Sequence, residues 1–325
     1  MPSSISNSKK IGAALLGKPT NFIRASLILL LILVAVVLGL EWTSLTVATH
    51  SSRILSRSAR EREEVKGFRR KPGGPKTVLL YGNSLLLEDV EFPRLHDQLQ
   101  SGGWDARSLV VVQTSYLDWH FGMRRLFDEG CNPDVYVMIL TPTQMAVDGY
   151  AGSIFAYYLM RGQDIFEVAS ATHIHPTEAA GLLFARYSSF YGLRADLRKN
   201  LLRYFIPGLN ELRAHLIPLA IKPPPADLVS REVEKRMREE RANIEQRGAK
   251  LVVVIPPVAD PNDHSDVAIQ ACQRAGVAVL APVSAGEFSP DMFTDGFHMG
   301  QAGAKIFTDR LIPELLKKIN NQETQ

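Results

Sequence analysis

A serine hydroxyl follows a short apolar stretch in residues 77–87, whose sequence is TVLLYGNSLLL. Residues 77–81 have the composition of a buried strand, and Gly82-Asn83-Ser84 then predicts a tight turn. Ser84 is thus expected just beyond the carboxyl end of a buried strand, where open α/β sheets form their ligand crevice. A serine is a weak nucleophile alone and becomes reactive when a base, itself held by a third group, removes its proton.

A candidate base and its orienting acid stand far downstream, in residues 293–298 (FTDGFH), just before a helical pattern. Asp295 and His298 are three residues apart, so the carboxylate can reach ring Nδ1 and leave Nε2 free for a serine hydroxyl. The alternative is that Ser84 is only a turn residue and His298 only begins a helix. The order and setting of the two motifs favour a Ser84–His298–Asp295 triad for acyl transfer.

The elements that must position these residues follow from the hydrophobic pattern. Strands are predicted at 77–81, 108–112, 134–140, 250–255 and 277–282, and helices at 92–100, 117–129, 228–246, 265–274 and 302–319. Such alternation is typical of a parallel sheet covered on both faces. We therefore expect an α/β protein with a flavodoxin-like three-layer α/β/α architecture and a five-stranded parallel sheet, whose strand ends converge on one crevice.

With Gly82-Asn83-Ser84 near the start of this domain and Asp295-x-x-His298 near its end, the chain resembles the SGNH (GDSL-type) hydrolase superfamily. The resemblance covers about residues 76–319, with a large unmatched middle. It implies that Ser84 is the nucleophile, His298 the general base and Asp295 the acid that orients the base. The first block is Gly-Asn-Ser rather than Gly-Asp-Ser, a change that keeps the nucleophile.

The chain departs from the family pattern where an oxyanion hole is needed. Family members typically use the nucleophile's N–H, a glycine in a second block and an asparagine in a third. Here the second predicted strand is followed by Thr114-Ser115 and the third by Thr-Pro-Thr-Gln. The N–H of Ser84 or Ser115 and the side-chain amide of Gln144 are the candidate donors. The alternative for Gln144 is that it caps the following helix.

Composition limits the classes of protein that the chain can belong to. Its 325 residues suffice for one large α/β domain with an insertion, and 46% hydrophobic against 22% charged residues indicates a mostly globular chain. The formal net charge of +3 and the lack of a basic run with interleaved aromatics argue against nucleic acid as a partner. Cys131 and Cys272 form no framework, and no zinc-type spacing is present, so we expect neither metal nor cofactor.

An apolar stretch follows a basic N-terminal tail, residues 1–24, which has four bases and no acid. Residues 25–40 carry no charge and would form a helix of about 24 Å, against a bilayer core of about 30 Å. Extension to Val47 completes a span, with Glu41 near the interface and Trp42 as an interfacial ring. The alternatives are a buried core helix, which does not suit a position so near a basic terminus, and a cleaved signal peptide, whose apolar core is usually shorter and whose cleavage site here is poor. We expect a transmembrane signal anchor at 25–47.

The charges beside this span predict its orientation. The four N-terminal bases abut it, whereas the next base is Arg53, so the N-terminus is expected in the cytoplasm and the remaining chain outside. In a bacterium this means a single-pass protein of the inner (plasma) membrane with its domain on the periplasmic side. We expect a charged stalk and Pro/Gly linker at 48–75, the α/β domain at 76–320 and a polar tail at 321–325.

Residues 145–227 do not follow the strand–helix alternation and are expected as a mainly helical insertion in the domain. An insertion at this edge of a sheet is more often a lid or substrate wall than an idle loop. Its aromatic residues either stack on sugar rings or form the insertion's own core, and the second role is the commoner one. Contact with lipid or with a membrane partner stays open.

The residues and the resemblance together predict a membrane-anchored serine esterase or O-acyltransferase. Anchoring outside the cytoplasm favours acyl esters, with acetyl as the implied group, of cell-envelope or exported polysaccharide. The resemblance to polysaccharide O-acetylation factors makes a membrane-bound acyl-transfer partner an option. The alternative is a non-catalytic binding or assembly module of an envelope polysaccharide system, in which the altered oxyanion blocks mark lost chemistry.

Overall fold

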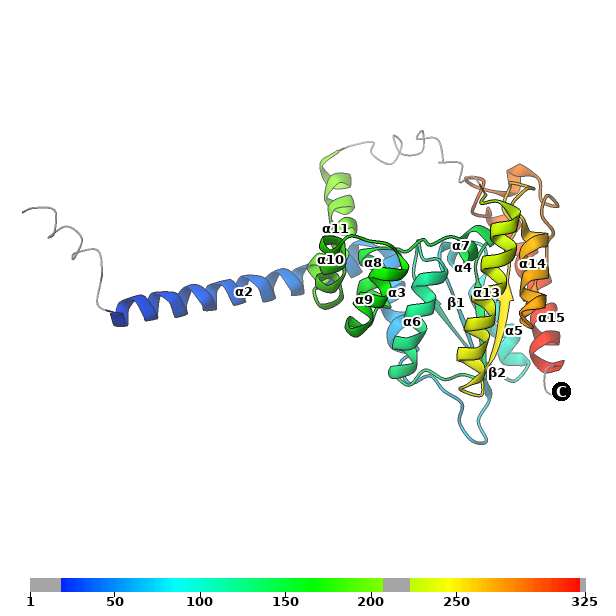
Figure 1. The fold of residues 1–325 in the computed structure, drawn as a ribbon, viewed down its shortest axis with the longest axis horizontal. Coiled ribbons are helices and arrows are strands. Elements are labelled where there is room, and N and C mark those ends of the chain that lie inside the picture. The colour runs from blue at the N-terminus through cyan, green and yellow to red at the C-terminus, as the bar shows by residue number, and fades with distance from the viewer. Residues whose placement is uncertain (1–18, 207–222, 322–325) are drawn as a thin grey trace, which may run out of the picture.

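A five-stranded parallel sheet forms the centre of the computed structural model, which describes residues 19–206 and 223–321. The strands are β1 (Lys76–Gly82), β2 (Trp104–Val110), β3 (Val135–Ile139), β4 (Lys250–Val254) and β5 (Ala278–Leu280), in the spatial order β2-β1-β3-β4-β5. This is the flavodoxin-like order, in which the first strand separates the second from the third. The fold class and five strands predicted from the sequence are confirmed (Figure 1).

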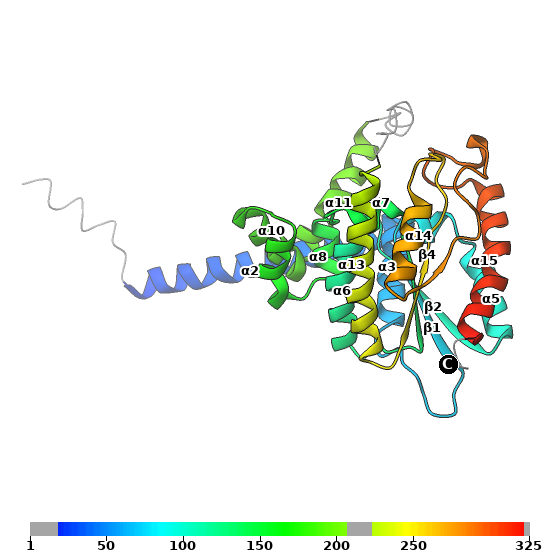
Figure 2. The ribbon, with the colours of Figure 1, turned by 45° about the vertical axis from the view of Figure 1, so that its right-hand side comes forward.

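Helices cover both faces of the sheet because its residues are buried on both sides. Along β1, Leu79 and Tyr81 belong to one hydrophobic cluster while Val78 and Leu80 belong to another. The first cluster packs under α6 (Tyr116–Asp128), α13 (Ala226–Glu245) and α14 (Ser265–Arg274). The second packs under α5 (Phe92–Ser101) and α15 (Gln301–Asn321), which lie together on the opposite side (Figure 2). Near-continuous apolar strands are what a doubly covered parallel sheet requires.

The segment expected as a charged stalk is a helix that packs on the sheet edge. In α3 (Arg53–Glu64), the Glu61 carboxylate accepts hydrogen bonds from the N–H of Val110 at 2.7 Å and the hydroxyl of Ser108 at 2.6 Å. Ser58 donates to the carbonyl of Val110 at 2.8 Å. These bonds satisfy polar groups on the edge of β2 that pairs with no other strand in the described residues. Helix α3 is therefore part of the α/β body and not a solvated spacer.

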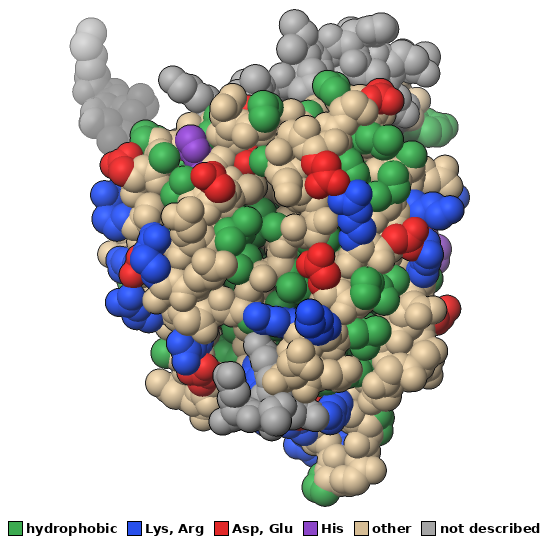
Figure 3. All heavy atoms as spheres, turned by 90° about the vertical axis from the view of Figure 1, so that its right-hand side faces the viewer, with side chains coloured by type: hydrophobic (Ala, Val, Ile, Leu, Met, Phe, Trp, Pro, Cys, Tyr) green, Lys and Arg blue, Asp and Glu red, His purple; other side chains and the backbone are tan. Residues whose placement is uncertain are grey.

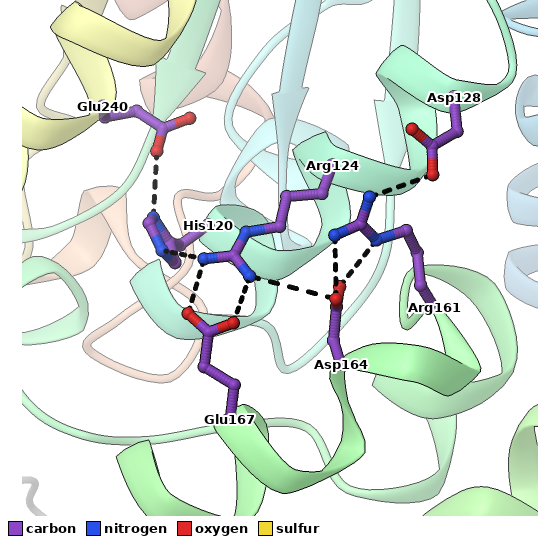
Figure 4. A network of polar contacts seen from close by, with 7 residues as sticks. All are labelled: His120, Arg124, Asp128, Arg161, Asp164, Glu167 and Glu240. Carbon is purple, nitrogen blue, oxygen red and sulfur yellow. Dashed lines mark hydrogen bonds and ion pairs between the residues drawn. The ribbon is translucent and has the colours of Figure 1, made fainter.

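The insertion is mainly helical, as predicted, and comprises α8 (Ser153–Tyr158), α9 (Ile165–Ala171), α10 (Pro176–Tyr187) and α11 (Ser189–Phe205) within its described part. A polar network joins its first half to the body (Figure 4). Arg124 of α6 makes a bidentate pair with Glu167 of α9 and also donates to His120 at 3.2 Å. The other ring nitrogen of His120 lies 3.4 Å from Glu240, a buried residue of α13. The insertion is therefore fixed to α6, which is itself joined to α13 through His120.

The N-terminal described element is α2 (Pro19–Ser51), which projects from one end of the body (Figure 1). Its stretch Phe22–Ser51 is long and apolar enough to cross a membrane, and its most apolar part makes no buried contact with the rest of the chain. Residues 1–18, with three of the four bases used to predict orientation, and residues 322–325 lie outside the described residues.

Candidate active site

Ser84 and His298 meet at the carboxyl edge of the sheet, although they are 214 residues apart in the sequence. The Nε2 atom of His298 lies 2.8 Å from the Oγ atom of Ser84. Its Nδ1 atom lies 2.8 Å from Oδ2 of Asp295. The three side chains predicted as a triad thus form one chain of hydrogen bonds, in which Asp295 sets the tautomer that leaves Nε2 free to accept the serine proton.

Local hydrogen bonds hold Asp295 in this position. Its Oδ1 atom accepts the backbone N–H of His298 at 2.7 Å and that of Phe297 at 3.0 Å. Partial burial raises the pKa of Asp295, but these two N–H groups and the His298 ring lower it more, so the net pKa lies below the ordinary value. Asp295 is therefore ionised at neutral pH and stabilises an imidazolium beside it.

The turn that presents Ser84 depends on a close backbone approach. Gly82 ends β1, and a Cβ atom on it would lie 2.7 Å from the carbonyl oxygen of Ile139 in β3. The sequence explains Gly82 by the tightness of the turn, whereas the structure explains it by this contact. Asn83 is buried, donates to the carbonyl of Thr114 at 2.7 Å and accepts the N–H of Leu85 at 3.0 Å. Ser84 then begins the short helix α4 (Ser84–Glu88).

A buried carboxylate joins the nucleophile's helix to the histidine loop. Asp89 follows α4, and its Oδ1 atom accepts the N–H of Met299, the residue after His298, at 2.8 Å. Its Oδ2 atom has no hydrogen-bond partner. Burial raises the pKa of Asp89 well above its usual value, and Glu88 and Asp295 add to the rise against the Met299 bond. The sequence gave no reason to single out Asp89.

The structure does not bring the predicted oxyanion donors Ser115 and Gln144 to Ser84. The N–H of Ser115 donates to Asp118 at 2.8 Å, because Ser115 caps α6. The Oε1 atom of Gln144 accepts the N–H of Thr141 at 3.0 Å in a capping box of α7 (Pro142–Ala146). Neither residue lines the cleft that contains Ser84 and His298. Serine and glutamine often cap the N-terminus of a nearby helix. A helix begins shortly after each of the strands β2 and β3, so Ser115 and Gln144 cap these helices.

Gln113 lies beside the cleft, at a position where the sequence does not indicate a donor for the oxyanion hole. It follows β2, lines the cleft with Ser84, and has a φ of 65°, the left-handed region that favours glycine. In the described part of the chain, the N–H groups of Ser84 and Gln113 donate no hydrogen bond to another protein group. Both are therefore free to donate to a ligand oxygen. The sequence gave little indication of this role for Gln113, because a glutamine residue is not expected to adopt a positive φ.

The cleft around the triad has a volume of about 910 Å³, within the range of ligand pockets. One wall carries Ser84, Leu87, His298 and Thr294. The facing wall comes from the insertion, through residues of α11 that include Ala195, Arg198 and Leu202, and from the start of α3 at Ser52 and Leu55. The insertion thus lines this cleft as well as forming its own core. Across the described residues, no group of three or more His, Cys, Asp and Glu side chains is placed to hold a metal ion.

Comparison with known proteins finds similarity to solved structures but not to known sequences. No known protein family matches its sequence, and none of the curated proteins does. Among solved structures, LAE5, an alpha/beta hydrolase enzyme from the metagenome of Lake Arreo, Spain, has a TM-score of 0.39 and 10% identity, over 76% of this chain and 96% of that chain. Axe2, an acetylxylan esterase from Geobacillus stearothermophilus, has a TM-score of 0.37 and 11% identity, over 77% and 96%. At these values the likeness carries no argument about activity, which must come from the site.

Proposed function

We propose that the protein is a membrane-anchored serine esterase or O-acyltransferase of the SGNH type. The observation that carries the proposal is the chain of hydrogen bonds from Ser84 through His298 to Asp295. Such an arrangement in an open cleft activates a serine for attack on a carbonyl carbon. The non-catalytic alternative gives no reason for a serine, a histidine and a carboxylate to be aligned in this way.

The chemistry begins with transfer of the Ser84 proton to Nε2 of His298 as Oγ attacks the ester carbonyl. The resulting imidazolium is stabilised by Asp295, 2.8 Å from Nδ1. The tetrahedral intermediate collapses when His298 returns the proton to the leaving alcohol, and an acyl-enzyme forms on Ser84. The acceptor, water in an esterase or a sugar hydroxyl in a transferase, is then deprotonated by His298 and takes the acyl group.

The oxyanion of the intermediate requires donors beside Ser84. We assign them to the backbone N–H groups of Ser84 and Gln113, which are free in the described structure. An N–H that points at the developing negative charge lowers the barrier by a few kcal/mol, typically about 3. The left-handed backbone of Gln113 supports this role, because strained backbone persists at functional sites.

The substrate class follows from anchoring and from the open cleft. A span at residues 25–47 with the basic tail in the cytoplasm puts the domain on the periplasmic side of a bacterial inner membrane. Acyl esters of cell-envelope or exported polysaccharide, with acetyl as the acyl group, are the substrates available there. A membrane-bound acyl-transfer partner would supply the donor if the reaction runs as a transfer.

Covalent labelling tests this proposal directly. The full chain in detergent is treated with a fluorophosphonate probe and mapped by peptide mass, and release of p-nitrophenol from p-nitrophenyl acetate is followed in parallel. We expect the probe on Ser84, its loss in Ser84→Ala and His298→Ala, and normal labelling in Ser289→Ala, an exposed serine outside the triad. A folded protein that neither labels nor releases p-nitrophenol would support the non-catalytic module instead.

A further inference from the structure

The apolar helix α2 is bound to the insertion through Glu41. The Glu41 carboxylate accepts the N–H of Ser189 at 2.6 Å and that of Phe190 at 3.2 Å, and also the hydroxyl groups of Ser188 and Ser189. These groups belong to the first turn of α11 and the residue before it. A carboxylate is a strong acceptor at a helix N-terminus, so the α10–α11 junction is fixed at the level of Glu41 along α2.

A second contact fixes the direction of α11 relative to α2. The side-chain amide of Asn200 donates to the hydroxyl of Ser51 at 2.8 Å. Between this contact and the one at Glu41, both helices advance by about 15 Å. They therefore run side by side in the same direction, with the buried residues Ser44 and Ala48 of α2 facing the body. The C-terminal end of α11 consequently lies farther from the apolar part of α2 than its N-terminal end does.

The length of the apolar stretch places Glu41 at a boundary. The uncharged residues 25–40 form a helix of about 24 Å, so Glu41, the first charged residue after them, lies near one boundary of a hydrocarbon core about 30 Å thick. Side chains in this stretch are exposed in the structure. If α2 spans the membrane, as proposed above, Glu41 and the α10–α11 junction lie where hydrocarbon meets headgroups.

Exposed aromatic side chains flank that junction in the sequence. Phe184 and Tyr187, in the last turn of α10, are 65% and 72% exposed, and Phe190 is 43% exposed. Trp42, which follows Glu41, is 71% exposed. The α10 helix lies at the end of the body from which α2 projects (Figures 1 and 2). The opposite end carries Lys, Arg, Asp and Glu side chains distributed between apolar ones (Figure 3).

We propose that Trp42, Phe184, Tyr187 and Phe190 form an interfacial surface that docks the insertion against the phospholipid bilayer. Aromatic rings favour the boundary between hydrocarbon and headgroups, where one edge is apolar and the other is wet. The surface rests on the proposed anchoring by α2 and adds a second attachment beside it, so that the body is held upright on the membrane and does not swing about a single helix.

This docking sets how far the catalytic cleft lies from the membrane. Ser52, the first residue after α2, lines the cleft together with Leu55 and the Ala195–Leu202 face of α11. From Glu41 to Ser52 the helix rises by about 16 Å. Ser52 at the cleft therefore lies at most about 16 Å from the level of Glu41, so the cleft opens near the bilayer.

Fluorescence quenching in vesicles tests the surface. The full chain is reconstituted in phosphatidylethanolamine–phosphatidylglycerol vesicles with a single fluorophore on Tyr187→Cys, Tyr204→Cys or Leu31→Cys. The native Cys131 and Cys272 are buried, and burial raises the pKa of each thiol to about 12, so they do not compete for the label. The quenchers are lipids with a nitroxide on the headgroup or near the end of an acyl chain.

Tyr204 is the matched control because it is 83% exposed on the same helix, α11, but at the end away from the membrane. We expect the headgroup nitroxide to quench the label at 187 and not the label at 204, and the acyl-chain nitroxide to quench the label at 31. Quenching at 31 without quenching at 187, or equal quenching at 187 and 204, would overturn the docking surface.

The outcomes separate the failure of this inference from the failure of the proposed function. If no position is quenched, α2 is not in the bilayer and the surface is wrong, while fluorophosphonate labelling of Ser84 in the same samples still reports the catalytic proposal. If all positions behave as expected but Ser84 does not label, the docking surface stands and the enzymatic proposal falls.

Discussion

The backbone N–H of Met299 donates to the Oδ1 atom of Asp89 at 2.8 Å, and this bond ties the loop of His298 to the helix that Ser84 begins. Asp89 ends the short helix that Ser84 begins, while Met299 follows His298 directly. We therefore expect the distance between Ser84 and His298 to depend on a side chain that hydrogen-bonds to neither of them.

Replacement of Asp89 tests this dependence. Asp89→Ala leaves the Met299 N–H buried without an acceptor, at a cost of about 1–3 kcal/mol in the free energy of unfolding. We expect slower fluorophosphonate labelling of Ser84 as the histidine loop loosens. Asp89→Asn keeps an acceptor oxygen and should restore most of the rate. Equal rates in the alanine variant and the wild type would show that the loop is positioned by other bonds.

Asp295→Asn is expected to lower kcat by about 10³-fold or more with little change in KM, because an amide can hold the ring in the wrong tautomer and cannot stabilise the imidazolium. The measurement is ester turnover at saturating p-nitrophenyl acetate. Asp291→Asn removes an exposed carboxylate four residues earlier and should keep full turnover. A mild effect of Asp295→Asn would mean that His298 is oriented without it.

Gly82→Ala should damage both the fold and the nucleophile. The new Cβ atom would lie 2.7 Å from the Ile139 carbonyl oxygen, so β1 or β3 must shift, at about 1–3 kcal/mol in the free energy of unfolding. The shift moves the turn before Ser84, and labelling should fall with stability. Gly39→Ala, where no atom lies within 4 Å of the added methyl group, is the control and should change neither.

Substitutions of Gln113 distinguish an oxyanion contact made by its backbone N–H from one made by its side-chain amide. Gln113→Gly relieves a left-handed strain of about 1–2 kcal/mol, and the greater freedom of the unfolded chain offsets about 0.4–1 kcal/mol of this gain. We expect a modest net rise in stability and unchanged turnover, since the N–H is kept. Gln113→Ala keeps both the N–H and the strain and should resemble the wild type. A loss of turnover in both variants would assign the oxyanion contact to the side-chain amide.

The stability of the fold should rise as the pH falls from about 8 to 6. Burial raises the pKa of Asp118 to about 7, against the opposing N–H groups of Ala151 and Ser115. Because this pKa lies above that of the unfolded chain, the contribution to stability is full at low pH and is lost as the pH rises through about 7. One such group changes the free energy of unfolding by at most about 1.4 kcal/mol per pH unit.

Urea unfolding of the detergent-solubilised chain at several pH values measures this slope. Asp118→Asn should reduce the slope between pH values of about 6 and 8, and part should persist because burial also raises the pKa of Asp89. Asp291→Asn should leave it unchanged. The same slope in Asp118→Asn and the wild type would assign the pH dependence to other groups.

Much of the scaffold was predictable, since each strand carries its own signal. The runs at 251–254 and 135–139 are continuously apolar, as central parallel strands are, and the pattern predicts both strands within one or two residues of their bounds. The edge strand β2 was placed too late because Trp104, Ala106 and Ser108 alternate with more exposed residues, and only the apolar run at its end was used.

The contact between Ser84 and His298 was predictable because motif order and strand topology require it. The remainder of the site depends on relations that residue types do not encode. The positive φ of Gln113 follows from how β2 leaves the sheet, and the role of Asp89 follows from a loop more than two hundred residues away. Ser115 and Gln144 were predicted as donors from residue type, whereas nearby helix starts use their groups.

The bonds from α3 to β2 determine where this chain can be cut. Removal of every residue before the Pro/Gly linker would eliminate the apolar helix. It would also remove Glu61 and Ser58, which form hydrogen bonds with the N–H and C=O groups of β2. A bare edge strand pairs readily with other chains, so such a fragment should aggregate. A cut directly before Ser52 keeps the whole of α3, including its N-terminal cap, and removes the apolar helix together with its bonds to α11.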